Sequence, residues 1–184
     1  MQKSSTIEQV EAATRHWLQH LVVAENLCPF AGQPLREGRV RFSVSLATRE
    51  DELLTDLERE LELLANDASI ETTLLLAPEL FADFVDYNQF LDLVDELLGL
   101  LELHGTFQVA SFHPAYQFAG TAPEDAENYT NRSPYPMLHL LREDTLAHVI
   151  SAYPDIRSIP ERNIERMQAI GRERLRHLLE TCYD

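Results

Sequence analysis

The stretch RVRFSVSLA, residues 39–47, decides the fold class, because its apolar and polar residues alternate. Valine, phenylalanine and leucine fall on one face of an extended chain, while arginine and serine fall on the other. Alternation with a period of two predicts a half-buried β-strand. Two later stretches, TTLLLAP (72–78) and TFQVASFH (106–113), are also predicted as strands. The first of these two is continuously apolar, which predicts deeper burial.

The segments between these strands have the residue spacing of helices. Leucines recur at intervals of three and four residues after Thr48, and a second periodic segment covers about residues 80–103. Strand, helix, strand, helix, strand is the pattern of crossover units with parallel strands. We therefore expect an α/β (or α+β) fold, with a small sheet of three to four strands around a βαβαβ core. A ferredoxin-like plait is the alternative if the chain contains a further strand.

Helical segments flank this core on both sides. Apolar spacing predicts an N-terminal helix over about residues 6–25. After residue 113 a long stretch rich in proline and aromatic residues lacks periodicity, and loops of this length are often functional. Two short helices are expected at about 135–143 and 145–152, and a long C-terminal helix at about 160–181.

The composition fits one globular domain that spans residues 1–184. Apolar residues make up 45% of the chain, which supports a packed core and argues against intrinsic disorder. The net charge of −16 argues against binding to nucleic acid or to anionic membranes, which both require basic surfaces. The first residues lack the apolar core of a signal peptide, and no apolar run approaches the length of a membrane span. We therefore expect a cytoplasmic protein.

His113 is the first candidate for a catalytic residue. In open α/β sheets ligands bind outside the carboxyl ends of the strands, and His113 stands where the third predicted strand meets the long loop. An imidazole in this position can act as a general acid, a general base or a metal ligand. The structural alternative is that its ring binds a nearby carbonyl and shapes the turn into Pro114.

The segment NRSPYPMLHLLRE, residues 131–143, carries further candidates, because it concentrates arginine, histidine and proline in an acidic chain. Its serine followed by proline resembles a helix cap with a first-turn proline, so residues 137–144 are predicted as a helix. His139 and Arg142 would then share one face of that helix. His139 is interpreted as a second catalytic residue, which transfers a proton or orients the substrate.

Arg132 would lie just before the start of this helix, where free backbone amides and the helix dipole favour anions. Together with Arg142 it predicts a cradle for phosphate or carboxylate. Tyr129 and Asn131 are the expected supporting donors. The alternative is that both arginines form ion pairs with nearby acidic residues.

Cys28, in the stretch NLCPF, is a candidate nucleophile if a histidine activates its thiol. A lone cysteine among leucine, proline and phenylalanine is more often a small buried apolar residue. Neither cysteine of the chain belongs to a CxxC or zinc-ribbon motif, and compact metal-ligand spacing such as HExxH is absent. Glycine-rich phosphate loops and GxSxG are absent too, so the sequence identifies neither a metal site nor a cofactor.

Three stretches together, NLCPF (26–30), SFHP (111–114) and NRSPYPMLHLLRE (131–143), resemble an uncharacterised bacterial family that is catalogued as domain of unknown function 1415. The resemblance covers nearly the whole chain. It implies a single-domain cytoplasmic protein, and it implies no particular reaction. The stretches selected here for their chemistry are also the hallmark stretches of that family.

Three functions are consistent with these patterns. The leading hypothesis is a site for a small anionic metabolite, with His113 as general acid or base and the two arginines binding phosphate or carboxylate. The second is a non-catalytic module that binds another protein or forms a homodimer through its C-terminal helix and long loop. The third is a metal-dependent hydrolase that uses His113 and His139.

Overall fold

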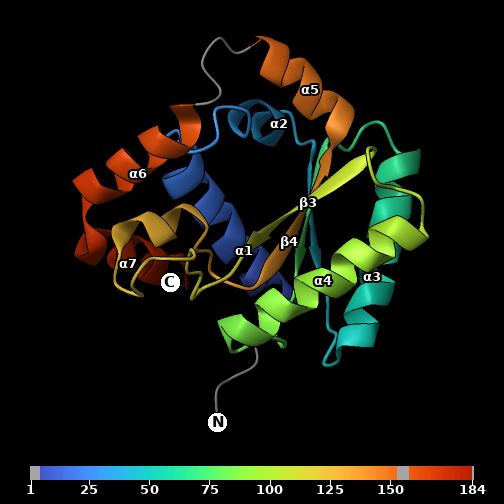
Figure 1. Cartoon of the computed structure of the whole chain (residues 1–184), viewed down its shortest axis with the longest axis horizontal. Coiled ribbons are helices and arrows are strands. Elements are labelled where there is room, and N and C mark those ends of the chain that lie inside the picture. Colours follow the sequence, from blue (N-terminus) through green and yellow to red (C-terminus); the bar gives the residue numbers. More distant parts are fainter. Residues whose placement is uncertain (1–4, 153–157, 184) are drawn as a thin grey trace.

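The computed structural model describes residues 5–152 and 158–183, and a four-stranded sheet lies at its centre (Figure 1). β1 and β2 are parallel, whereas β4 lies between β2 and β3 and is antiparallel to both. The three predicted strands therefore run in one direction and end at the same edge of the sheet, which we call the carboxyl edge. The strands are β1 (Val40–Val44), β2 (Thr72–Leu76), β3 (Phe107–Phe112) and β4 (Met137–Arg142).

The expected α/β fold with three to four strands is confirmed, but the helix predicted over residues 137–144 is wrong. Residues 137–142 form β4, which has a hydrogen-bonded strand on each side. The run MLHLL fits a buried strand and a buried helix equally well, so the two neighbouring strands decide between them. A helix begins only at the next residue, as α5 (Glu143–Ala152).

Two helices cover one face of the sheet, as the leucine spacing predicted. α3 (Glu50–Asn66) follows β1, and α4 (Phe84–Leu100) follows β2. Their apolar side chains form one core cluster with Leu75, Leu138 and Leu140 of the strands. This succession of elements is βαβαββ, whereas a ferredoxin-like plait is βαββαβ, and the plait is not confirmed.

Helices from both ends of the chain lie on the other face (Figure 1). The predicted N-terminal helix is confirmed, although its second part is π-helical, and it packs against the sheet through a second core cluster. The predicted C-terminal helix is broken at Gly171, whose φ of 83° is positive. The elements on this side are α1 (Ile7–Trp17), η1 (Leu18–Val23), α6 (Ile159–Ile170) and α7 (Arg172–Glu180).

Three short elements complete the described part of the chain: α2 (Gly32–Arg36), η2 (Ala126–Thr130) and η4 (Thr181–Tyr183). η2 lies within the long loop that follows β3, and α6 and α7 pack against it. Within residues 5–152 and 158–183, no helix combines the length and the apolar character needed to cross a lipid bilayer.

The polar face of β1 packs against α3, although the side chain of Arg41 stays 38% exposed. Arg41 donates two hydrogen bonds to the carboxylate of Glu60, and the buried hydroxyl of Ser43 donates a third over 2.9 Å. Burial alone would raise the pKa of Glu60, but these hydrogen bonds and the charge of Arg41 lower it overall. The apolar residues Val40 and Phe42, on the opposite face of β1, are only half-buried. The sheet therefore keeps a partly open apolar face.

Candidate functional site

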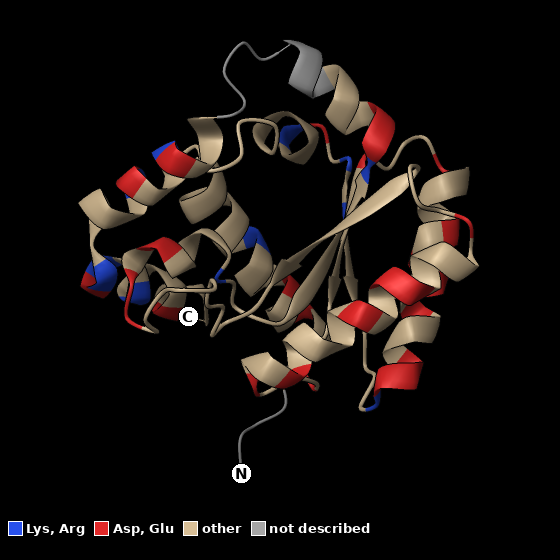
Figure 2. Ribbon diagram, in the orientation of Figure 1, with Lys and Arg blue, Asp and Glu red and all other residues tan. Residues whose placement is uncertain are grey.

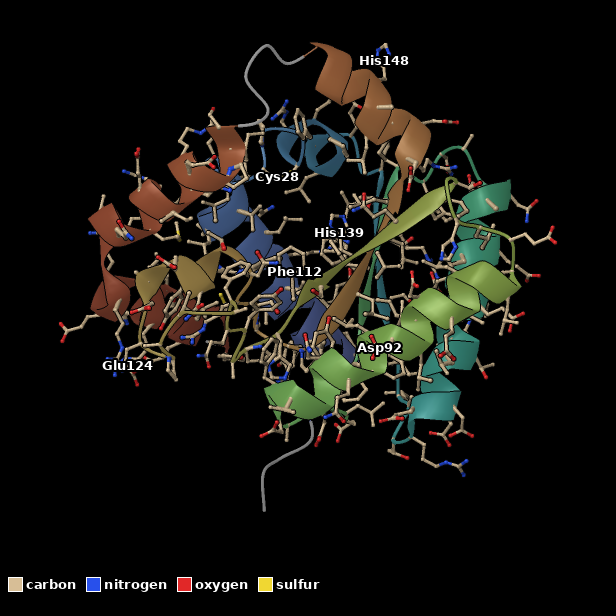
Figure 3. All side chains as sticks on the ribbon, viewed as in Figure 1. Cys28, Asp92, Phe112, Glu124, His139 and His148 are labelled. Atoms are coloured by element: carbon tan, nitrogen blue, oxygen red, sulfur yellow. The ribbon has the colours of Figure 1, made fainter. Side chains whose placement is uncertain are left out.

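His139 lies in the middle of β4, on the face of the sheet that α1 covers (Figure 3). Its ring lies against that of Phe112, with 6.2 Å between the ring centroids. Its Nε2 lies 2.8 Å from the hydroxyl oxygen of Thr72, and this hydroxyl donates to the carbonyl oxygen of Leu140 over 2.6 Å. A threonine hydroxyl has one proton to donate, so it must accept its second hydrogen bond from the Nε2–H of His139.

This tautomer leaves Nδ1 of His139 with a free lone pair. Among the residues that the structure describes, none donates a hydrogen bond to this nitrogen. Burial lowers the pKa of His139 to about 4, so the ring is neutral at neutral pH. His139 therefore presents a neutral hydrogen-bond acceptor in a fixed orientation, which is the arrangement of a candidate general base.

The surface around His139 is mostly apolar and only partly covered. Several of its neighbours on this face are half-buried, whereas Leu74, which pairs with His139 across the strands, and Leu76 and Met137, which point in the same direction, are buried. Partial cover leaves apolar area that a ligand can remove from water. We call this surface the histidine face, and it consists of Val40, Phe42, Thr72, Ala110, Phe112 and His139.

His113 lies at the end of β3, on the opposite face of the sheet, where its ring packs against Phe84 and Tyr87 of α4. The residue is 1% exposed. Its Nε2 donates to the carbonyl oxygen of Phe81 over 2.8 Å, and its Nδ1 accepts from the amide of Ala115 over 3.0 Å. Burial lowers the pKa of His113. Both ring nitrogens are thus occupied as the structural alternative described, and a catalytic role for His113 stays a prediction.

The two histidines do not meet, because they lie on opposite faces of the sheet. A metal ion bound by both therefore has no support in this arrangement. Across residues 5–152 and 158–183, no group of three or more histidine, cysteine, aspartate or glutamate side chains is placed to hold a metal ion.

Cys28 is partly buried in the loop that follows η1. Burial raises the pKa of its thiol, which keeps the thiol protonated and weakly nucleophilic. Its apolar surroundings belong to the core cluster beneath α1. Within the described chain, no contact joins Cys28 to a histidine that could activate it, so its role as a nucleophile stays a prediction.

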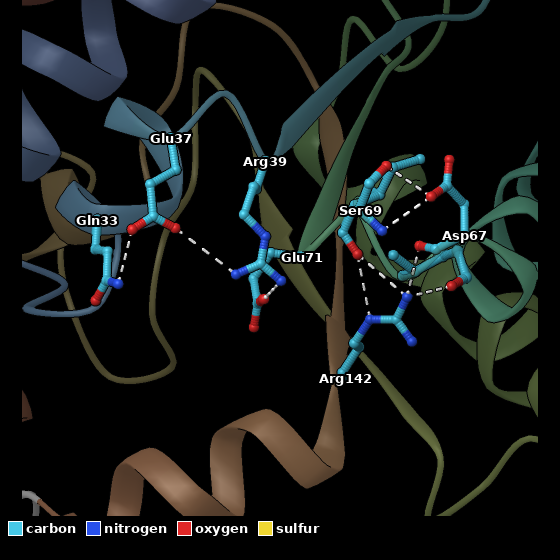
Figure 4. Close-up of polar contacts among 9 residues, drawn as sticks. Gln33, Glu37, Arg39, Asp67, Ser69, Glu71 and Arg142 are labelled. Atoms are coloured by element: carbon cyan, nitrogen blue, oxygen red, sulfur yellow. Dashed lines mark hydrogen bonds and ion pairs between the residues drawn. The ribbon is translucent and has the colours of Figure 1, made fainter.

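Arg142 binds the end of α3 rather than an acidic partner (Figure 4). Its guanidinium donates to the carbonyl oxygens of Leu64, Asp67 and Ile70, the latter two over 3.1 Å. These carbonyls lie where α3 ends, and the negative end of the helix dipole favours a cation there. Residues three apart in a strand point to opposite faces, so the predicted shared face of His139 and Arg142 is wrong.

Arg132 holds the long loop after β3. Its Nε donates to the carbonyl oxygen of Tyr116 over 3.1 Å, and its Nη2 donates to that of Pro123 over 2.7 Å. The guanidinium also lies 4.6 Å from the ring centroid of Tyr129. The carbonyl of Arg132 itself accepts from the indole N–H of Trp17, over 3.0 Å. Arg132 thereby connects the loop to α1, and in the described chain it forms no ion pair; its role as an anion ligand stays a prediction.

Asn131 and Tyr129 also stabilise this loop. The side-chain amide of Asn131 donates to the backbone carbonyl of Ser111 over 3.1 Å. The backbone carbonyl of Asn131 accepts from the backbone amide of His113 over 3.2 Å. Tyr129 is 4% exposed and belongs to the core. The stretches SFHP and NRSPYP are therefore neighbours in space, but their contacts are mainly with each other's backbone.

Two important residues were not singled out from the sequence. Thr72 sets the tautomer of His139, and it could be found only through the pairing of β2 with β4. Asn128 stabilises the long loop, because its side chain accepts from Phe118 and Thr121 and donates to Ala122. Asparagine is common in turns, so its position in the loop was a weak signal.

Residues 9–177 match a family model described as "Protein of unknown function (DUF1415)". This match covers most of the chain and includes all three hallmark stretches. In the two other comparisons, no curated protein and no solved structure matched. The chain therefore belongs to the family of proteins of unknown function DUF1415, as those stretches predicted.

Proposed function

We propose that the protein binds a small, largely apolar molecule on the histidine face, and that Nδ1 of His139 accepts a hydrogen bond or a proton from it. The observation that carries this proposal is Nδ1 of His139, which has no partner among the described residues and belongs to a ring whose tautomer is set by Thr72. Contact with the half-buried side chains of this face would supply most of the affinity, and the single hydrogen bond would orient the ligand.

The ligand that we propose is neutral, whereas the sequence predicted an anion. Arg132 and Arg142, the two cations expected to bind an anion, donate to backbone carbonyls instead. Arg15 touches the histidine face, since its guanidinium lies 3.9 Å from the ring centroid of Phe42, but it already pairs with Glu11. A neutral ligand with an O–H or N–H group would meet a free acceptor, whereas an anion would meet a cation that is already paired.

The same geometry limits the chemistry that His139 can perform. A general base is most effective when its pKa is near the working pH, and the pKa of His139 is about 4. Such a base removes only protons that are already acidic. We therefore propose ligand binding as the primary role, with proton transfer confined to substrates that carry an acidic O–H or N–H group.

A matched pair of probes tests this proposal. Indole and 1-benzofuran have nearly the same shape, but only indole has an N–H donor. Each is titrated into isotope-labelled protein, and amide chemical shifts are followed along β3 and β4. A hydrogen bond to an uncharged acceptor contributes about 1 kcal/mol, so indole should bind roughly five-fold more tightly than 1-benzofuran.

Two variants test whether His139 causes the preference for indole over 1-benzofuran. His139→Leu should remove the preference for indole, whereas His104→Leu, at an exposed histidine between α4 and β3, should keep it. Equal affinity for the two probes, or a preference that survives in His139→Leu, would refute the proposal. Benzoate is the third probe, and stronger binding of benzoate than of indole would restore the anionic ligand predicted from the sequence.

A further inference from the structure

A groove of about 620 Å³ opens at the carboxyl edge of the sheet, between the segments that follow β1 and β2. Residues 48–50, which lead into α3, form one wall, and residues 80–83 with the first half of α4 form the other. No residue of the histidine face lines this groove. Open α/β sheets bind ligands outside the carboxyl ends of their strands, and a volume of this size suits a small molecule.

The second wall carries the apolar residues of the groove, and its shape is fixed. Phe81 lines it together with Leu80, Phe90 and Leu93. The φ of Phe81 is 59°, a left-handed conformation that a bulky residue adopts only where its surroundings hold it. Its ring lies 4.9 Å from that of Phe90, and its carbonyl accepts the Nε2–H of His113. The hydrogen bond from the buried His113 therefore fixes the position of Phe81, so this part of the groove wall has its shape before a ligand binds.

The rim of the groove is negatively charged. Glu50, Asp83 and Asp86 lie along it, and Arg49 is the one cation among the described residues that line it. The Arg49 guanidinium is bound by the carboxylate of Asp51, so it does not neutralise the rim. Figure 2 shows acidic residues where α3 and α4 begin, at the same end of the molecule. The net charge of −16 extends this negative potential beyond the groove.

We propose that this groove binds an organic ammonium ion with an apolar or aromatic body. The body would pack against Leu80 and Leu93, and the ammonium group would lie at the rim near Glu50 and Asp86. Both carboxylates are on exposed residues, and in the described chain neither has a partner that a ligand would have to displace. An anion of the same shape would be repelled by these carboxylates. The proposal does not depend on the histidine face, because the two sites share no residue.

The test compares two probes of similar shape and opposite charge, 2-phenylethylammonium and 3-phenylpropionate, at low ionic strength. Each is titrated into the full-length, isotope-labelled protein. The ammonium ion should cause saturable shifts at amides of residues 48–50 and 80–93, and the carboxylate should cause none. Equal responses to both probes, or the absence of saturable shifts at these amides, would overturn the proposal.

A double substitution, Glu50→Gln with Asp86→Asn, should weaken binding of the ammonium ion about five-fold. Asp83 is left unchanged, because its carboxylate caps α4. The matched control is Glu58→Gln with Asp92→Asn, which makes the same change of charge on exposed residues of α3 and α4 outside the groove (Asp92 is labelled in Figure 3). The control should weaken binding less than about two-fold. Equal weakening by both pairs would show only an effect of overall charge, and the proposed site would be wrong.

Discussion

Arg142→Ala removes the guanidinium that binds the end of α3. In the folded protein this group donates to the carbonyls of Leu64, Asp67 and Ile70, and it lies 5.9 Å from the ring centroid of Phe107. Alanine keeps the backbone pairing of β4 with its neighbours, because the substitution changes only the side chain. The carbonyls at the end of α3 would lose their charged donor, and α3 and β4 would lose a direct connection.

The expected decrease in the free energy of unfolding follows from these contacts. A hydrogen bond from a charged donor contributes about 1.5–3 kcal/mol. Because Arg142 is only partly buried, water replaces part of each bond, and we take about 1 kcal/mol for each of the three carbonyls. The sum of about 3 kcal/mol corresponds to a decrease in melting temperature of roughly 6–12 °C for a domain of this length.

Urea unfolding followed by circular dichroism measures this loss. Arg142→Lys should recover only part of it, because an ammonium group keeps the charge but lacks the planar fork that reaches several carbonyls. The control is Arg176→Ala, at an exposed arginine whose ion pair with Glu180 is 3.5 Å long, and it should cost less than about 0.5 kcal/mol. A loss below about 1 kcal/mol for Arg142→Ala would refute the structural role and return Arg142 to the list of candidate anion ligands.

Three further predictions concern other parts of the structure. Glu60→Gln should lower the free energy of unfolding by about 2 kcal/mol near neutral pH. Because the folded-state pKa of Glu60 is lowered, the difference in stability between the variant and the unchanged protein should shrink as the pH falls below the ordinary pKa of 4.5. Urea unfolding at several pH values measures this difference. The folded-state pKa of His139 is also lowered, so the stability that its neutral ring contributes is complete above pH 6.5 and is lost as the pH falls toward about 4. The melting temperature should therefore decrease between pH 6.5 and about 4, and His139→Gln should make this decrease smaller. Gly171→Ala should cost about 2 kcal/mol in urea unfolding, because a side chain is strained at the φ of 83° and ψ of 147° that separate α6 from α7, and an unchanged midpoint would contradict this.

The βαβαβ core could be predicted because its signals are local. Alternation in residues 39–47 and leucine spacing in the segments that became α3 and α4 depend only on the period of a strand or a helix. β4 could not be predicted in this way. Its residues are mostly apolar on both faces because it is central in the sheet, and the single histidine within the run MLHLL does not establish a period.

The sequence by itself determined the class of fold, the family and which side chains could carry chemistry, because these depend on residue types and their spacing. Only the tertiary structure decided which of those side chains are available. Thr72, 67 positions away in the chain, binds Nε2 of His139, and in the part of the chain that the structure describes Nδ1 has no partner. Arg142 is occupied by carbonyls more than 70 positions away, and His113 by that of Phe81. Such partners are set by strand register and helix packing, and no local pattern encodes them.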